Sequence, residues 1–486
     1  MSSTPVNTPV SAQVQLLIDG KWRNGANGQT KPIINPATEQ QIGTLAVAET
    51  ADLLDAARAA QKAFRGWADT SPLDRANMLR GTATLLRQRA AEIAKVITAE
   101  NGKTLAEANV EVNWAAEFFD WFAEEGRRTY GREVPARLQG MRQVVTREPV
   151  GPVLLLSPWN WPLITATKKV SAALAAGCSI VLKPAEETPS ALVHLANALM
   201  DSGLPPGVFN LVYGNPAHIS QTLIDAPEIR KVAFTGSVPV GRLLSEQAAR
   251  HLKPISLELG GHAPVIIFED ADIESAVKKI MPIKFRTCGQ VCSSPTRFFV
   301  HQSQIKRFSE LLAEGASRLK VGNGAEAGTE MGPLVTARRL ASVTALVEDA
   351  VKAGAHIVTG GKRIGDKGYF FAPTVMTNVN DSAAIMHEEP FGPVVPMTAF
   401  NTYEEVVARA NSVDLGLAAY AFTSSLATAR RIGRDLDCGV VGINTLGVST
   451  VEAPFGGFKN SGHGKEGGIE GLDSYLVSKY VVEAIS

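Results

Sequence analysis

Residues 153–189 read VLLLSPWNWPLITATKKVSAALAAGCSIVLKPAEETP, and they give the strongest indication of the class of fold. The stretch contains two short apolar runs, at 153–157 and 179–183, separated by a segment with helical spacing. Apolar runs of this length, rich in Val, Ile and Leu, are typical of parallel strands that are buried on both faces. The stretch therefore predicts two strands of a parallel sheet with a helix between them.

Three further runs of the same kind follow, at 208–212, 231–234 and 255–259, and helical segments alternate with them. This alternation predicts an α/β fold with a doubly wound parallel sheet. Ligands of such sheets bind beyond the carboxyl ends of the strands. Four residues fall at these predicted ends, and we expect them to meet at one crevice: Asn160, Lys183, Gly236 and Glu258.

A second α/β lobe is predicted after Gly261. It begins with an apolar run at 264–268 and a helix through Phe285, and it continues with a strand at 297–301 and a helix over 304–319. With 486 residues the chain is long enough for two large lobes.

Helical spacing also extends from Glu49 to Gly102. Ser71-Pro72 predicts the start of a second helix in this region, and Asn101-Gly102 predicts its end. Three stretches that alternate between polar and apolar residues are expected to form exposed strands outside both lobes, and strands of this kind often pair with a partner subunit. They are QLLIDGKW at 15–22, MRQVVTRE at 141–148 and SYLVSKYVVEA at 474–484.

The charge balance and the cysteine count exclude several classes of protein. Lys plus Arg equals Asp plus Glu at 48 each, so no net field attracts nucleic acid or an anionic membrane. Four cysteines are too few for a disulfide framework, and no cluster of histidines suggests a metal site. Residues 1–15 resemble a disordered arm rather than a targeting signal, and no apolar run is long enough to span a bilayer. We expect a cytoplasmic protein.

Cys292 stands in the segment FRTCGQVCSSPTRFF, residues 285–299, just before a predicted strand and among small side chains. A substrate can reach a thiol in such a loop. The thiol becomes a nucleophilic thiolate only near a base or a positive charge, because the pKa of free cysteine is about 8.5. An unpaired cysteine is more often a buried structural residue. A catalytic interpretation therefore depends on the partners of Cys292.

Two partners are predicted at strand ends. Glu258 ends the apolar run ISLEL, where burial would raise the pKa of its carboxyl as a general base requires. Asn160 lies between Pro158 and Pro162, and its amide can donate to an oxyanion. Each residue alone has a simpler structural explanation, since an isolated glutamate often caps a loop and an asparagine between prolines often bonds its own turn.

Lys183 and Glu186 follow the second predicted strand, where the ribose of a dinucleotide binds in doubly wound sheets. A carboxylate accepts from both ribose hydroxyls but repels a 2′-phosphate, which favours NAD and leaves NADP possible. In AFTGSVPVG, residues 233–241, Gly236 and Ser237 form a strand-to-helix turn whose backbone donors suit a pyrophosphate. Two glycines in such a turn often serve packing alone.

The motifs together resemble those of the aldehyde dehydrogenase superfamily over almost the whole chain. Seven of them occur in the family's order: PWNWP at 158–162 (PWNFP in the family), KPAE at 183–186, FTGS at 234–237, LELGG at 257–261, GQVC at 289–292, EEPFGP at 388–393 and PFGGFKNSG at 454–462. The resemblance implies NAD(P)-dependent oxidation of an aldehyde to a carboxylic acid through a thioester on a cysteine.

The resemblance also implies a role for each matching residue. It implies that Cys292 is the nucleophile, Glu258 the base and Asn160 the oxyanion donor, and that Lys169 supports the active-site network. Its implied cofactor contacts are Lys183 and Glu186 to the adenosine ribose, Glu389 and Phe391 to the nicotinamide ribose and ring, and Ser157, Trp159, Ala185, Gly236, Ser237, Val240, Leu259 and Gly260 along the rest of the dinucleotide.

Within the family, the region INTLGVSTVEAPFGG at 443–457 is similar to the succinate-semialdehyde and related ω-oxo-acid semialdehyde dehydrogenases. This similarity implies that Arg286 and Ser449, with Trp161 beside them, grip the far carboxylate of a small semialdehyde. Lys168 stands where the subfamily often has a second arginine, and a lysine lacks the bidentate fork. The alternatives are a dehydrogenase of neutral aliphatic or aromatic aldehydes, a CoA-acylating enzyme, and a non-catalytic NAD-binding protein on the same scaffold.

The resemblance also divides the chain into domains. It implies an NAD-binding domain at 12–126 and 148–258, a catalytic α/β domain at 259–460, and small β oligomerisation strands at 127–147 and 472–486 in a homodimer or homotetramer. One departure from the family is Thr287-Cys288, where Asn-Ala is usual. A redox-sensitive disulfide between Cys288 and Cys292 is one interpretation, and an inert second thiol is the commoner case.

Overall fold

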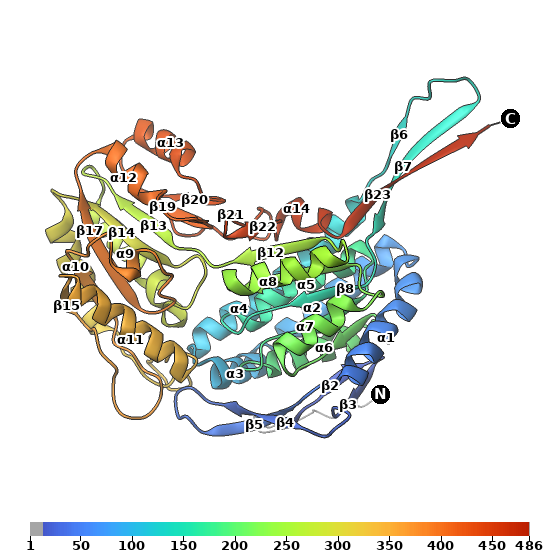
Figure 1. The fold of residues 1–486 in the computed structure, drawn as a ribbon, viewed down its shortest axis with the longest axis horizontal. Helices are drawn as coiled ribbons and strands as arrows, with labels where there is room; N and C mark the ends of the chain where they lie inside the picture. Colours follow the sequence, from blue (N-terminus) through green and yellow to red (C-terminus); the bar gives the residue numbers. More distant parts are fainter. Residues whose placement is uncertain (1–12, 486) are drawn as a thin grey trace.

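The computed structural model describes residues 13–485. Figure 1 shows two lobes side by side and a thin arm that extends from one of them. The sequence predicted a disordered segment at residues 1–15. Residues 1–12 of it lie outside the described residues. The prediction is wrong for its last residues, because β1 (Gln13–Val14) pairs in parallel with β5 (Gln41–Ala46). β4 (Thr30–Ile34) completes this small sheet.

The larger lobe contains the predicted parallel sheet. Its five central strands lie in the order β12, β11, β8, β9, β10, and all neighbouring pairs are parallel. They are β8 (Val153–Leu156), β9 (Ile180–Lys183), β10 (Phe209–Leu211), β11 (Lys231–Gly236) and β12 (Ile255–Leu259). The direction of winding reverses between β8 and β11, which makes their carboxyl ends a ligand site of the doubly wound type. The predicted fold class is confirmed.

Antiparallel strands close both edges of this sheet. β2 (Leu16–Ile18) pairs with β10 and with β3 (Lys21–Arg23), and β22 (Gly462–His463) pairs with β12. The prediction that QLLIDGKW lies outside both lobes is therefore wrong. The three residues of β2 are consecutive, apolar and buried, so this run is a strand between β10 and β3 that is covered on both faces rather than an exposed alternating one.

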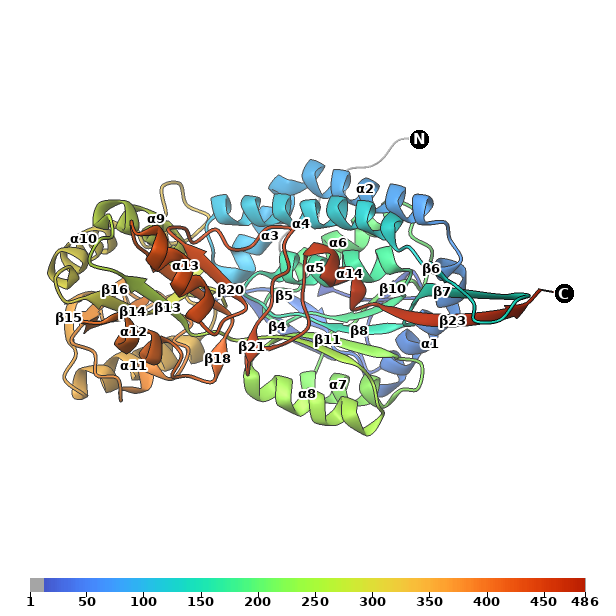
Figure 2. The same cartoon turned by 90° about the horizontal axis from the view of Figure 1, so that it is seen from above.

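Helices cover both faces of the sheet, as Figure 2 shows. They are α1 (Thr50–Ala68), α2 (Pro72–Gln88), α3 (Ala90–Asn101), α4 (Leu105–Glu125), α5 (Pro162–Ala176), α6 (Ser190–Asp201), α7 (Pro216–Asp225) and α8 (Val238–Arg250). Ser71 caps α2, and Gly102, with φ of 90°, ends α3, as predicted. The single helix predicted between them is wrong, because Arg89 has φ −98° and ψ 10° and separates α2 from α3.

The second lobe is built on a seven-stranded sheet in the order β15, β16, β17, β14, β13, β19, β20. The strands are β13 (Ala263–Ile267), β14 (Pro295–His301), β15 (His356–Thr359), β16 (Thr374–Thr377), β17 (Val394–Phe400), β19 (Ala418–Phe422) and β20 (Val440–Ile443). Only the β15–β16 pair is antiparallel among these described strands. The helices are α9 (Ile273–Phe285), α10 (Ile305–Arg318), α11 (Ala337–Lys352), α12 (Tyr403–Ala410) and α13 (Leu426–Asp435). The second predicted α/β lobe is confirmed.

The arm is an antiparallel sheet of β6 (Arg132–Val134), β7 (Met141–Pro149) and β23 (Leu476–Ala484). It projects from the larger lobe in both views (Figures 1 and 2). Val477, Tyr480 and Val482 of β23 are exposed large apolar residues. Within residues 13–485, no helix combines the length and apolar character that crossing a membrane requires.

Candidate active site

A cavity of about 500 Å³ opens beyond the carboxyl ends of β8, β11 and β12, and residues of both lobes line it. The predicted site residues that line it are Ser157, Trp159, Asn160, Trp161, Lys168, Gly236, Ser237, Val240, Glu258, Leu259, Gly260, Arg286, Cys292, Glu389, Phe391 and Ser449. Lys169, Lys183, Ala185 and Glu186 do not line it. A thiol, a carboxyl group and a side-chain amide therefore share one cavity.

Cys292 is partly exposed in the loop that connects α9 to β14. This loop has a tight backbone, since Thr287 and Cys288 have φ of 50° and 56°. Gly289 follows with φ of 72°, and a side chain there would collide with the carbonyl of Gly392. Burial raises the pKa of the Cys292 thiol to about 12, while the Lys168 ammonium opposes the shift. The thiol is therefore protonated at neutral pH before ligands bind.

Asn160 follows β8, and its side chain is buried beside the cysteine loop. The Asn160 Nδ2 donates a hydrogen bond of 3.0 Å to the backbone carbonyl of Gln290. One N–H of the amide is held in this way, and the second is free to point at a substrate oxygen. The carboxamide is thus oriented by the same loop that carries the nucleophile.

Glu258 ends β12, next to Gly462 of β22. Both of its carboxyl oxygens are buried and have no hydrogen-bond partner among the described residues. Burial, and then the charge of Glu466, raise the pKa of the Glu258 carboxyl well above its usual range. The ammonium groups of Lys168 and Lys169 act in the opposite direction. A raised pKa makes the ionised carboxylate a stronger base, which suits Glu258 to take a proton from water.

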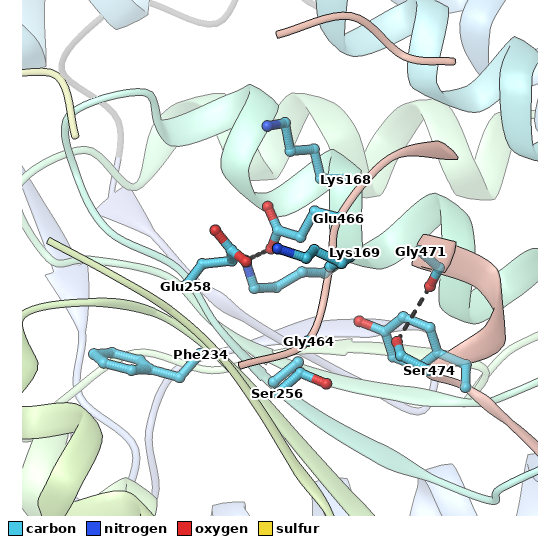
Figure 3. A pocket seen from close by; sticks show the side chains of 12 residues that line it. Lys168, Lys169, Phe234, Ser256, Glu258, Gly464, Glu466, Gly471 and Ser474 are labelled. Carbon is cyan, nitrogen blue, oxygen red and sulfur yellow. Dashed lines mark hydrogen bonds and ion pairs between the residues drawn. The ribbon is translucent and has the colours of Figure 1, made fainter. Parts of the chain in front are cut away.

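Lys169 belongs to the network behind Glu258. Its ammonium forms an ion pair with Glu466 and donates to the Thr235 hydroxyl. Figure 3 shows the carboxyl of Glu258 pointing toward Glu466 and Lys169, while Lys168 extends away from them. A cavity of about 10 Å³ lies among these residues, which is close to the smallest space that holds one water molecule.

The opposite side of the large cavity suits a nicotinamide nucleotide. One carboxyl oxygen of Glu389 is buried and has no hydrogen-bond partner among the described residues, and desolvation raises the pKa of this carboxyl to about 8. A side chain at Gly260 would collide with that carboxylate. Phe391 packs edge-to-face on Trp159, with ring centroids 5.5 Å apart. Ser237 begins α8 without a side-chain cap, which leaves the helix N-terminus open to a pyrophosphate. These residues fit the predicted cofactor.

Lys183 and Glu186 lie at the end of β9, one strand further from the thiol. Their side chains form an ion pair with Nζ and Oε1 2.8 Å apart. Ala185 between them is buried. The carbonyl of Lys183 accepts a hydrogen bond of 3.2 Å from the Ser157 N–H, which joins this turn to the turn after β8. The pair therefore lies next to the turn that follows β8, and its contact with an adenosine ribose stays a prediction.

Three N–H donors in the same cavity have no acceptor among residues 13–485. The Arg286 Nε and the Trp161 Nε1 are buried without a hydrogen-bond partner. Arg286 also lies over the Trp161 ring, with its guanidinium carbon 5.4 Å from the centroid. The Lys168 ammonium lies over two aromatic faces, at 4.5 Å from the Phe455 centroid and 5.4 Å from the Phe118 centroid, and has no ion-pair or hydrogen-bond partner among the described residues. Ser449 also lines the cavity.

Among residues 13–485, no group of three or more His, Cys, Asp or Glu side chains is arranged to hold a metal ion. All four cysteines are free thiols, and Cys288 is fully buried. Burial raises the pKa of the Cys288 thiol above its usual range.

Comparison with known proteins agrees with this geometry. The model of the aldehyde dehydrogenase family matches residues 22–481. The chain belongs to that family. The family resemblance predicted from the seven motifs is confirmed, and the protein is an NAD(P)-dependent aldehyde dehydrogenase.

Individual relatives are similar over nearly their whole length. The chain is 46% identical over 468 residues to the 4-(hydroxymethyl)benzenesulfonate dehydrogenase TsaD1 of Comamonas testosteroni, covering 96% of this chain and 97% of that one. It is 40% identical over 467 residues to the NADP(+) succinate-semialdehyde dehydrogenase GabD of Escherichia coli, with coverage of 96% and 97%. The crystal structure of succinate-semialdehyde dehydrogenase from Burkholderia pseudomallei matches with a TM-score of 0.96 at 40% identity, covering 99% of this chain and 100% of that one.

The sequence did not point to several residues that this aldehyde dehydrogenase places at its cavity. Glu466 contacts the Lys169 ammonium, and Arg339 lies 5.8 Å from the Phe391 ring centroid. Phe455 lies under the Lys168 ammonium. Glu466 stands in a charged, glycine-rich segment, and Arg339 stands near the start of a helix. Both segments have the composition of ordinary solvent-exposed surface. Phe455 had a signal, because it belongs to the PFGG motif.

Proposed function

We propose that this aldehyde dehydrogenase oxidises aldehydes that carry a distal anionic group, through a thioester on Cys292. The observation that supports this substrate class is the set of unpaired donors at Arg286, Lys168 and Trp161 in the same cavity as the thiol. A buried cation with no carboxylate partner is costly unless a ligand supplies the opposite charge. A bound anion would satisfy all three donors.

In the first half of the proposed reaction, the Cys292 thiol loses its proton to solvent, and the thiolate sulfur adds to the aldehyde carbon. The carbonyl oxygen becomes an oxyanion that accepts hydrogen bonds from the Asn160 amide and the Cys292 backbone N–H. Glu389 and Phe391 would hold the nicotinamide, which when bound would accept the hydride that leaves this carbon. The carbon is oxidised by two electrons, and it remains bonded to sulfur as a thioester.

In the second half, Glu258 takes a proton from a water molecule that attacks the thioester carbon. The carbon–sulfur bond breaks, the acid leaves, and Cys292 regains its proton. Burial and the charge of Glu466 keep the pKa of Glu258 high enough for a base that works near neutral pH. This role also supports hydrolysis over transfer to CoA, and a product assay with and without CoA would separate the two.

The distal anion is a carboxylate or a sulfonate, because relatives of both kinds are similar to the chain. A small semialdehyde such as succinate semialdehyde is the carboxylate candidate predicted from the sequence. A lysine at position 168 is a point charge and does not favour the planar carboxylate as a second arginine would. Initial rates with matched carboxylate, sulfonate and neutral aldehydes of each chain length would rank the candidates.

Arg286→Met is expected to lower kcat/KM for anionic aldehydes by about 100-fold, since loss of a charged partner in a dry site costs several kcal/mol. The rate with a neutral aldehyde of the same length should change by less than about 3-fold, because that substrate has no group for the guanidinium. Arg318→Met serves as the control for loss of one arginine, because the Arg318 side chain on α10 is exposed. Equal losses with anionic and neutral aldehydes would contradict the proposed pocket.

We also propose that NAD is preferred over NADP, supported by the Glu186 carboxylate beside the turn after β9. Glu186→Ser should raise the NADP/NAD ratio of kcat/KM by about 10-fold, because it removes the repulsion of a 2′-phosphate and leaves Lys183 unpaired. Glu187→Ser on the same turn is the matched control. An unchanged ratio would show that position 186 does not face the ribose.

The exposed apolar residues of the arm support the proposal that it joins subunits into a homodimer or homotetramer. We also propose the domain limits predicted from the sequence, with an NAD-binding domain at 12–126 and 148–258, a catalytic domain at 259–460, and oligomerisation strands at 127–147 and 472–486. Four unpaired cysteines support a reducing cytoplasmic location. Sedimentation analysis of the intact chain and of a Tyr480→Glu variant would test the assembly.

A further inference from the structure

The segment from Asn101 to Glu111 underlies the active site and has no role in the reaction described so far. Within it, Lys103 and Glu111 form an ion pair, with Nζ and Oε2 2.6 Å apart, and both side chains have 0% exposure. An apolar pair of similar volume is often as stable as a buried ion pair, so stability alone does not explain these two charges. Their contacts indicate a demand on geometry.

The pair holds the turn that carries Asn160. The Lys103 Nζ donates to the backbone carbonyl of Asn160 at 2.9 Å and lies 3.9 Å from the Trp161 ring centroid. The other oxygen of Glu111 accepts from the backbone N–H groups of Leu163, at 2.8 Å, and Ile164, at 3.3 Å. The backbone is therefore fixed at residue 160 and at the first turn of α5.

The same segment also reaches the loop of the nucleophile. Glu107 accepts a hydrogen bond of 2.7 Å from the Thr287 N–H, where the backbone has positive φ. The second Glu107 oxygen accepts from the Thr104 N–H at 2.8 Å and completes the cap of α4. The start of α4 thus contacts both loops, and the Asn160 amide bonds Gln290 between them.

We propose that Lys103 and Glu111 are positioning residues that hold the Asn160 amide at the place where the oxyanion forms. The inference rests on the proposed thioester mechanism. An oxyanion donor acts only when it is held close to its best geometry, and small displacements cost large factors in rate. Neither residue lines the cavity, so each acts through the backbone of the turn.

The test is a double-mutant cycle on the rate of the first NADH burst. Lys103→Met and Glu111→Gln should each lower this rate by about 100-fold, as loss of one oxyanion donor does. Asn160→Ala should have a similar effect. The double variant Lys103→Met/Asn160→Ala should be no slower than Asn160→Ala within about 3-fold, because both changes remove the same interaction. Multiplied losses in the double variant would overturn the inference.

Two readouts separate positioning from general damage. Alkylation of Cys292 by iodoacetamide needs no oxyanion donor, and its rate should be unchanged in both single variants. Cofactor binding, followed by quenching of tryptophan fluorescence, should also be unchanged. Glu100→Gln is the matched control, since Glu100 is a buried carboxyl that bonds Ser190 and does not touch the turn. A loss of alkylation equal to the loss of burst would also overturn the inference.

If Lys103→Met does not fold, Glu111→Gln replaces it in the double-mutant cycle with Asn160→Ala. The glutamine removes the charge of Glu111 and keeps its volume. Failure of the proposed function has a different signature. In that case Cys292→Ala would retain the burst, which would show that the burst does not come from the thioester route. A burst that requires Cys292 together with multiplied losses would reject only the positioning role.

Discussion

Cys292→Ala is expected to lower kcat for aldehyde oxidation by at least about 10⁴-fold, because it removes the nucleophile on which the whole covalent route depends. The alanine variant should still bind NAD, since the side chains predicted to contact the cofactor are unchanged. Stopped-flow measurement of NADH would show neither a burst nor a steady phase.

Cys288→Ala is the matched control for this experiment. Cys288 is fully buried four residues away and does not line the cavity, so a substrate in the cavity does not reach its thiol. Its replacement should leave the burst amplitude intact. Retained oxidation in Cys292→Ala, or equal loss in both variants, would remove the basis of the proposed mechanism.

Glu258→Gln is expected to keep the burst of NADH and to lower the steady-state rate by about 10²- to 10³-fold, because only hydrolysis of the thioester needs this base. Mass spectrometry after mixing with aldehyde and NAD should detect acyl-enzyme at Cys292 in the variant. If burst and steady rates fall by the same factor, Glu258 acts before the thioester forms, and its assignment changes.

The pH dependence of hydrolysis gives a second test of Glu258. Its carboxyl must be unprotonated to act, and burial and Glu466 raise its pKa, so hydrolysis should fall as the pH decreases through that raised pKa. Glu466→Gln removes the charge that raises this pKa and should move the acid limb to lower pH. Lys169→Met removes a charge that lowers it and should move the limb to higher pH. Shifts in the same direction would contradict this electrostatic account.

The sequence was sufficient for the parts of the site that lie at strand ends. Asn160, Gly236 and Glu258 each follow or end an apolar run, and parallel strands bring such positions together whatever the helices do between them. Cys292 needed the motif order as well, because a loop cysteine has no periodicity. These residues meet in one cavity as predicted.

Charged residues that are buried by distant parts of the chain could not be predicted in this way. Lys103 and Glu111 are eight positions apart near the start of a helix, a spacing that resembles an ordinary solvated face. Burial comes from the turn around Trp161, far along the chain. Glu466 becomes part of the site because β22, which precedes it, pairs with β12. The prediction for β2 was wrong for a related reason, since β2 pairs with β10, which lies far along the chain.

The antiparallel edges of the large sheet have a consequence for how the chain matures on the ribosome. The central strands are complete once residue 259 has emerged, and Lys168 and Lys169 are already present at that point. β22, Lys465 and Glu466, which also surround Glu258, are translated about two hundred residues later. The surroundings that set the basicity of Glu258 are therefore completed only after the second lobe has been translated.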